Sequence, residues 1–90
     1  MGVKVHLHQS HVQYTNGERI IEGEGNTVGA CLKNIAGKYP EFGKHIFDKK
    51  GNLNHLFEIY VNGESAYPKE LEKGVKDGDD IYITRLLSGG

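Results

Sequence analysis

Residues 3–7, 56–61 and 81–84 alternate apolar and polar side chains with a period of two. This period is typical of a β-strand that buries one face and exposes the other. We therefore expect strands over these three ranges, and a further strand over 19–22. The positions expected to face inward are Val3, Val5, Leu7, Phe57, Ile59, Val61, Ile81 and Ile83.

Two Asn-Gly pairs predict tight turns, because both residue types tolerate the positive φ of a type I′ hairpin turn. The pair at 16–17 precedes the strand expected over 19–22, and the pair at 62–63 follows the strand over 56–61. Residues 9–15 admit two interpretations: the first strand continues to Thr15, or a loop at 9–11 breaks it.

An apolar stripe with helical spacing follows the second strand. Asn26 or Thr27 can cap the free N–H groups of a helix start, and Pro40 is expected to end the helix because its ring disfavours helical geometry in the preceding residue. We expect residues 41–54 to form a packed irregular connection with one tight turn. The residues on one face of the expected helix are Val28, Cys31, Leu32, Ile35 and Tyr39.

The order of these elements predicts the fold class. A helix between two pairs of strands lets the first and last strands lie side by side in parallel. We therefore expect an α+β fold of the β-grasp, ubiquitin-like type, with a mixed sheet and one main helix packed on one face. Residues 1–84 would form this domain, and 85–90 a flexible tail that ends in diglycine.

Length and charge narrow the function classes. A chain of 90 residues forms one domain with little spare core for a deep pocket. Its formal net charge of −1 provides no field that would attract nucleic acid or an anionic membrane. No apolar stretch is long enough for a signal peptide or a membrane span. We therefore expect a cytoplasmic protein without nucleic-acid or membrane partners.

The histidines and the single cysteine are candidates for chemistry. His6, His8 and His11 form an H-x-H-x-x-H pattern, but a metal site needs converging ligands. We favour histidines on a solvated strand face and expect no metal site. Cys31 lies on the apolar helix stripe, where a buried cysteine acts as a small hydrophobe, so we expect it in the core.

The tail carries the candidate reactive group. Two glycines lack Cβ atoms, so Gly89 and Gly90 can pass through a narrow channel and present a carboxylate to a partner. A free carboxylate is a poor acyl donor, and coupling to ATP converts it to a mixed anhydride open to nucleophilic attack. Residues 23–27 lack the lysine of a phosphate-binding loop. ATP would therefore be bound by the partner, and no cofactor by this chain.

A second candidate surface lies on the sheet. Leu56, Tyr60 and Tyr82 are expected on the face away from the helix. Exposed aromatic residues on a flat sheet indicate a docking surface for a partner. The alternative is that a loop or the tail covers them.

Four features occur in a fixed order along the chain. They are the helix opening at Thr27-Val28, the strand and turn from Tyr60 to Glu64, the turn from Lys76 to Asp79, and the terminal Ser88-Gly89-Gly90. In this order they resemble the MoaD/ThiS family of ubiquitin-like proteins. Nearest in pattern are the molybdopterin-synthase small subunit and the small archaeal modifier proteins, and the similarity spans the whole chain.

The resemblance implies a carrier or modifier that is acted upon, and not an enzyme. Gly90 would be adenylated by an ATP-dependent activating enzyme of the ubiquitin-activating type. It would then become a thiocarboxylate that receives sulfur from a donor and passes it on, with the large subunit of molybdopterin synthase as one acceptor, or be joined to lysines of target proteins. The tail residues expected to contact the activating enzyme are Leu86, Leu87, Ser88 and Gly89.

Two matters stay open at this point. Many family members carry a proline pair where this chain has residues 85–87, Arg-Leu-Leu, so sulfur transfer and protein conjugation are both retained. A hypothesis of a different class is a non-covalent ubiquitin-like adaptor, which would bind partners through the face with Tyr60 and Tyr82 and never use its tail.

Overall fold

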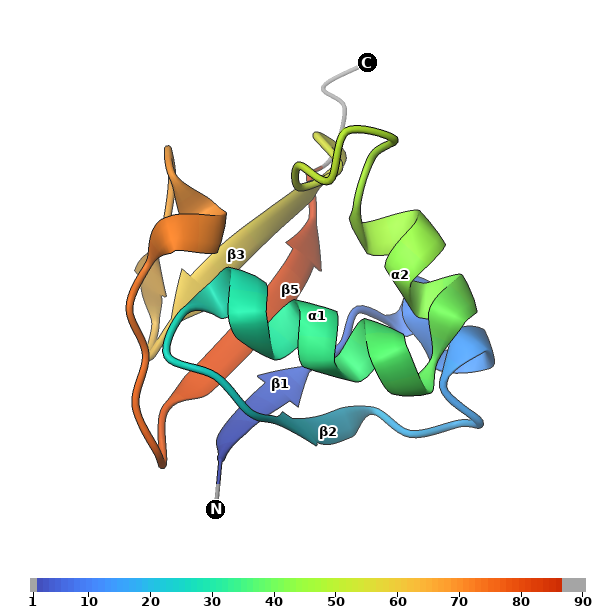
Figure 1. Ribbon diagram of the computed structural model, residues 1–90, viewed down its shortest axis with the longest axis horizontal. Coiled ribbons are helices and arrows are strands. Elements are labelled where there is room, and N and C mark those ends of the chain that lie inside the picture. The colour runs from blue at the N-terminus through green and yellow to red at the C-terminus, as the bar shows by residue number, and fades with distance from the viewer. Residues whose placement is uncertain (1, 87–90) are drawn as a thin grey trace.

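A computed structural model describes residues 2–86, which form a five-stranded sheet crossed on one face by a helix (Figure 1). The strand order is β2-β1-β5-β3-β4. β1 and β5 pair in parallel, and the other neighbours are antiparallel. The predicted mixed β-grasp sheet is confirmed. The strands are β1 (Val3–His6), β2 (Ile20–Gly23), β3 (Phe57–Val61), β4 (Glu64–Ser65) and β5 (Asp80–Arg85).

Helix α1 (Val28–Lys38) lies across the sheet as the apolar stripe predicts (Figure 1). Thr27 is its N-cap: the side-chain oxygen of Thr27 accepts a hydrogen bond from the Ala30 N–H at 3.1 Å, which satisfies one of the free donors at a helix start. The apolar stripe is buried against the sheet, apart from the partly buried Tyr39. Cys31 is in the core as expected, and burial raises the pKa of its thiol.

A second helix, α2 (Pro40–Ile46), occupies the first part of the stretch that we expected to be irregular. The expectation is therefore wrong for residues 41–46, whereas 47–54 form no helix or strand. Pro40 ends α1 but also begins α2, because the first helical position needs no N–H donor. Phe42 and Ile46, four residues apart, are both fully buried. A Cβ on Gly43 would lie 2.7 Å from the Ala36 Cβ, so the glycine allows α2 to approach α1 closely. The tight turn expected in this region is confirmed at residues 48–52.

The stretch that admitted two interpretations is a 3₁₀-helix, η1 (Gln9–Tyr14). The first strand is therefore broken and does not continue to Thr15, although the break is helical where we considered a loop. The side-chain Nδ1 of His8 accepts a hydrogen bond from the Ser10 N–H at 3.0 Å and so caps η1. Asn16 and Gly17 both have positive φ as predicted, but they follow η1 and do not close a two-residue hairpin.

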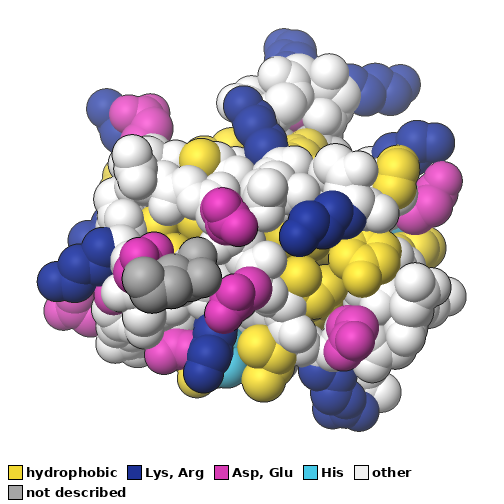
Figure 2. All heavy atoms as spheres, turned by 60° about the horizontal axis from the view of Figure 1, so that its bottom comes forward, with side chains coloured by type: hydrophobic (Ala, Val, Ile, Leu, Met, Phe, Trp, Pro, Cys, Tyr) yellow, Lys and Arg dark blue, Asp and Glu magenta, His cyan; other side chains and the backbone are white. Residues whose placement is uncertain are grey.

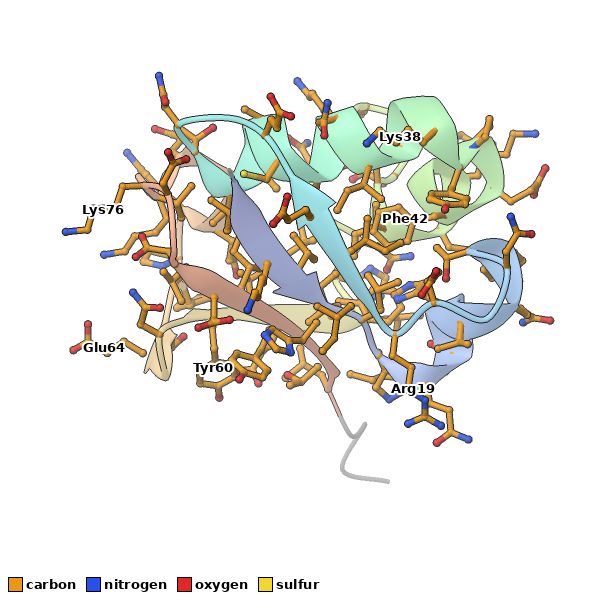
Figure 3. The ribbon with its side chains drawn as sticks, turned by 90° about the horizontal axis from the view of Figure 1, so that it is seen from below. Arg19, Lys38, Phe42, Tyr60, Glu64 and Lys76 are labelled. Atoms are coloured by element: carbon orange, nitrogen blue, oxygen red, sulfur yellow. The ribbon has the colours of Figure 1, made fainter. Side chains whose placement is uncertain are left out.

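The core lies between the helices and the sheet face that they cover, which we call the covered face; the opposite side is the open face. Figure 3 shows Phe42 among the side chains packed in this layer. The second Asn-Gly pair, at 62–63, joins β3 to β4 with positive φ at both residues, as predicted. The 3₁₀-helix η2 (Glu70–Glu72) packs on α1, where a Cβ on Gly29 would lie 2.9 Å from the Leu71 carbonyl oxygen. Within residues 2–86, no helix combines the length and apolar character that a membrane crossing requires.

Candidate functional site

Three aromatic residues meet across the central strands on the open face. The strand register places Tyr82 of β5 opposite His6 of β1 on one side and opposite Tyr60 of β3 on the other. The rings of His6 and Tyr82 stack with centroids 4.0 Å apart and an interplanar angle of 11°. Figure 3 shows Tyr60 on the side of the sheet away from the helices. The structure therefore brings two of the predicted docking residues together and adds His6 to them.

The third predicted docking residue, Leu56, lies at the end of the sheet where the tail begins. The Leu86 N–H donates a hydrogen bond to the Leu56 carbonyl oxygen at 2.8 Å, one step beyond the last pair of strand residues. Leu56 and Leu86 are both exposed, and Tyr82 is 42% exposed. Among residues 2–86, no segment covers this surface, so it is available to a partner in the described part of the chain.

Ile20 belongs to the same face and was missed at the sequence level. It lies opposite His6 in the register of β1 and β2, and it is exposed. The signal was present in the sequence: two consecutive isoleucines in a strand must point to opposite faces, so one of them had to leave the core. We refer to Ile20, Tyr60 and Tyr82 as the apolar set of the open face, and Leu56 and Leu86 lie beside it at the end of the sheet.

Charged groups surround this set with no dominant sign. Nε2 of His6 lies 2.9 Å from Oδ1 of Asp80, and this pair links the parallel strands β1 and β5. Lys4 lies in register with Glu22 on one side and with Asp80 on the other. Figure 2, which shows one face of the molecule, likewise has positive and negative side chains interspersed. Such a surface favours a partner with mixed charge over a polyanion.

The histidine pattern is split by the fold. His6 pairs with Asp80, His8 caps η1, and His11 is buried against the rings of Phe42 and Phe57. The expectation of histidines on a solvated strand face is wrong for His8 and His11, because β1 ends at His6. In the part of the chain that the structure describes, no three histidine, cysteine or acidic side chains are placed to share a metal ion.

The tail begins at the end of a central strand. β5 lies between β1 and β3, and its last residue, Arg85, pairs with Phe57. Leu86 follows and is the predicted tail contact that the structure describes. The other predicted tail residues lie outside the described residues: Leu87, Ser88, Gly89 and Gly90.

Comparisons with known proteins give a consistent result. A family model described as the ThiS family matches residues 6–90. A protein of Archaeoglobus fulgidus named as a putative sulfur carrier is 35% identical over 94 residues that cover all of both chains. The CysO of Amycolatopsis orientalis, whose crystal structure is a complex with BexX, has a TM-score of 0.85 and 29% identity, with 99% of this chain and 100% of that chain covered.

A fourth similarity concerns a modifier. The small archaeal modifier protein 1 of Methanosarcina acetivorans has a TM-score of 0.84 and 29% identity over 98% of this chain and 95% of that chain. The similarity in fold therefore extends to proteins named as sulfur carriers and to a protein named as a modifier.

Proposed function

The chain belongs to the ThiS family, and from this premise we propose that it is a ubiquitin-like carrier whose Gly90 carboxylate is activated with ATP by a partner enzyme. The observation that carries this proposal is the extent of the family match, which runs from residue 6 through most of the β-grasp domain to the diglycine at 89–90. A small carrier or modifier of this type is a substrate of other enzymes and has no catalytic site of its own.

Activation would proceed in two steps. The Gly90 carboxylate oxygen attacks the α-phosphorus of ATP, pyrophosphate leaves, and an acyl-adenylate forms. A sulfur nucleophile at the oxidation level of sulfide then attacks the acyl carbon, AMP leaves, and a thiocarboxylate remains. The glycines at 89–90 support this proposal because residues without Cβ atoms allow a partner's channel to close around the chain. ATP and the sulfur donor are held by partners, and we place this chemistry in the cytoplasm.

The open face is the surface that we propose for docking of the activating enzyme. Leu56 and Leu86 are exposed and lie where the tail leaves β5, and Tyr82 is exposed in the middle of the same strand. An enzyme that binds these side chains is therefore positioned to take up residues 87–90. Aromatic anchors of this kind commonly contribute a large share of the binding energy at protein interfaces.

Two acceptors follow from two kinds of relative. The relatives named as sulfur carriers favour a thiocarboxylate that delivers sulfur, to an acceptor such as a synthase of the molybdopterin type. The likeness to the archaeal modifier favours a second fate, in which a lysine amine attacks the acyl-adenylate and an isopeptide bond forms. We propose sulfur delivery as the principal fate and conjugation as the second candidate.

Intact-protein mass spectrometry tests the proposal. The full chain is incubated with ATP, Mg²⁺, an activating enzyme of the ubiquitin-activating type, and sulfide. We expect a species in which one oxygen of the C-terminal carboxylate is replaced by sulfur. The matched control is the same chain with one alanine added after Gly90, which keeps every residue but moves the carboxylate, and it should stay unmodified.

The same assay separates the carrier from a non-covalent adaptor. The exposure of Leu56 and Tyr82 is the observation that favours an adaptor. A chain without Gly89 and Gly90 should keep binding the enzyme but lose the modification if it is a carrier. The carrier proposal fails if the wild-type chain binds the enzyme, the enzyme hydrolyses ATP, and no acyl-adenylate or thiocarboxylate forms.

A further inference from the structure

A cavity of about 280 Å³ lies on the helix side of the sheet, beside the root of the tail. Its walls come from four parts of the fold: η1, the end of α2, the start of β3 and the end of β5. A space of this size holds several water molecules, each of which takes up about 30 Å³, so a small polyatomic ion fits. The lining residues include His11, Tyr14, His45, Phe57 and Arg85.

His11 is an unusual wall residue. It is 1% exposed, and neither of its ring nitrogens has a hydrogen-bond partner among residues 2–86. The rings of Phe42 and Phe57 pack against it with centroids 5.2 Å and 4.6 Å away. Phenylalanine rings have no N–H or oxygen, so they cannot form hydrogen bonds with the His11 nitrogens. An unpaired buried polar group destabilises the folded chain, and such groups in proteins are usually satisfied by a partner, a water or an ion.

The remaining wall carries positive charge and hydrogen-bond donors. Arg85 contributes a guanidinium, and His45 contributes a second imidazole. The His45 ring packs on the Tyr14 ring with centroids 4.2 Å apart. No aspartate or glutamate lines the cavity. The two salt bridges formed within residues 2–86 are His6–Asp80 and Lys44–Glu41, so Arg85 has no described carboxylate partner.

The electrostatic effect on His11 agrees with this geometry. Burial, and to a smaller extent the charges of His45, His8 and Arg85, together lower the pKa of His11 to about 4. His11 is therefore neutral at pH 7 and carries one N–H donor and one acceptor. A negative ion placed between these groups would be attracted by the Arg85 guanidinium and would accept a hydrogen bond from the free N–H of His11.

We propose that the cavity bounded by His11, His45 and Arg85 binds a small oxyanion of the size of phosphate, sulfate or acetate. The planar guanidinium of Arg85 donates to two oxygens of the ion, a geometry that suits arginine better than lysine. The N–H of His11 donates to a third oxygen of the ion or to an oxygen that Arg85 also contacts. This site is distinct from the chemistry of Gly90 and does not rest on the proposed function.

Histidine ring signals in NMR spectra of the full chain provide the test. Sodium phosphate is titrated into the protein, and sodium chloride is titrated into a second sample at the same ionic strength. We expect saturable shifts of the ring nitrogens of His11 and His45 with phosphate and not with chloride. The exposed His55 is the internal control and should show equal, small shifts with both salts. Because an anion favours the imidazolium form, phosphate should also raise the pKa of His11.

Two matched variants locate the bound ion. Arg85→Gln removes the cavity's guanidinium, and Arg19→Gln makes the same change at the chain's other arginine, which is exposed outside the cavity (Figure 3). We expect phosphate to bind about tenfold or more weakly to Arg85→Gln, as for loss of a charged hydrogen-bond partner, and normally to Arg19→Gln. Both side chains are exposed, so both variants should fold, and the unchanged signals of the core verify this.

Other results would overturn the proposal. If the His11 signals do not saturate with phosphate, the cavity holds only water. Equal weakening in the two arginine variants would mean that phosphate only screens surface charge. A parallel titration with sodium acetate distinguishes two classes of ligand. Equal binding of acetate and phosphate would show that a carboxylate group is enough for binding, and tighter binding of phosphate would show that the site prefers a tetrahedral ion.

Discussion

The two faces of the sheet are made from the same strands and have opposite character. In β5, Ile81 is 0% exposed on the covered face, and its neighbour Tyr82 is 42% exposed on the open face. The same alternation of buried and less buried residues holds in β1 and β3. Successive side chains of a strand point to opposite faces, so each strand contributes both to the core and to a surface that a partner can reach.

This difference teaches where stability and recognition lie in the molecule. The covered face is closed by α1, α2 and η2, and two glycines permit approaches that a Cβ would obstruct. The open face carries stacked rings and a few charges, with no described element above Tyr82. We therefore expect changes on the covered face to alter the free energy of unfolding, and changes on the open face to alter the reaction with the activating enzyme.

The largest expected effect comes from neighbouring substitutions in β5. Ile81→Ala should lower the free energy of unfolding by about 2–5 kcal/mol, because it leaves a cavity in a closely packed core. Tyr82→Ala should cost about 1 kcal/mol or less, mainly the loss of its stacking on His6. Urea denaturation followed by circular dichroism measures both. In the assay with the activating enzyme, by contrast, Tyr82→Ala should slow formation of the thiocarboxylate. Equal losses of stability would show that the open face also holds the fold together.

The next effect concerns the buried imidazole beside the covered face. The pKa of His11 is lowered to about 4 from its ordinary value of 6.5, so the unfolded chain takes up this proton first as the pH falls. The contribution of neutral His11 to the free energy of unfolding should be fully present above pH 6.5. It should be lost between pH 6.5 and about 4, by on the order of 1–3 kcal/mol. Denaturation at a series of pH values measures the slope. His11→Gln should flatten it, whereas His55→Gln, at an exposed position, should not.

The smallest effects come from two glycines of α1. Gly29→Ala should lower stability by about 1 kcal/mol net, because its Cβ would lie 2.9 Å from the Leu71 carbonyl oxygen and force η2 to move. Gly37→Ala meets no atom within 4 Å and should raise stability by about 0.5 kcal/mol, since alanine favours helix more than glycine. Thermal unfolding distinguishes them. A gain in both variants would mean that helix propensity outweighs packing at Gly29.

Much of the candidate site could be predicted from alternation alone. The period of two in the sequence predicts that Tyr60 and Tyr82 lie on the same face of the sheet. The strand register in the structure then places them opposite each other. It could not place His6 beside them, because strand pairing depends on contacts far apart in the sequence. The cavity at His11 was also unpredictable, since η1 and the end of β5 are more than seventy positions apart along the chain.

Local sequence fixed the strand faces, the stripe of α1 with its Thr27 cap, and the positive φ of the Asn-Gly pairs, because each depends on residues within a few positions. It misled at Pro40, since a proline that ends one helix is equally suited to begin another. Tertiary structure decided the helix α2, the break after β1 and the burial of His11. These depend on which apolar groups find partners across the sheet, and that choice is made by the packed fold as a whole.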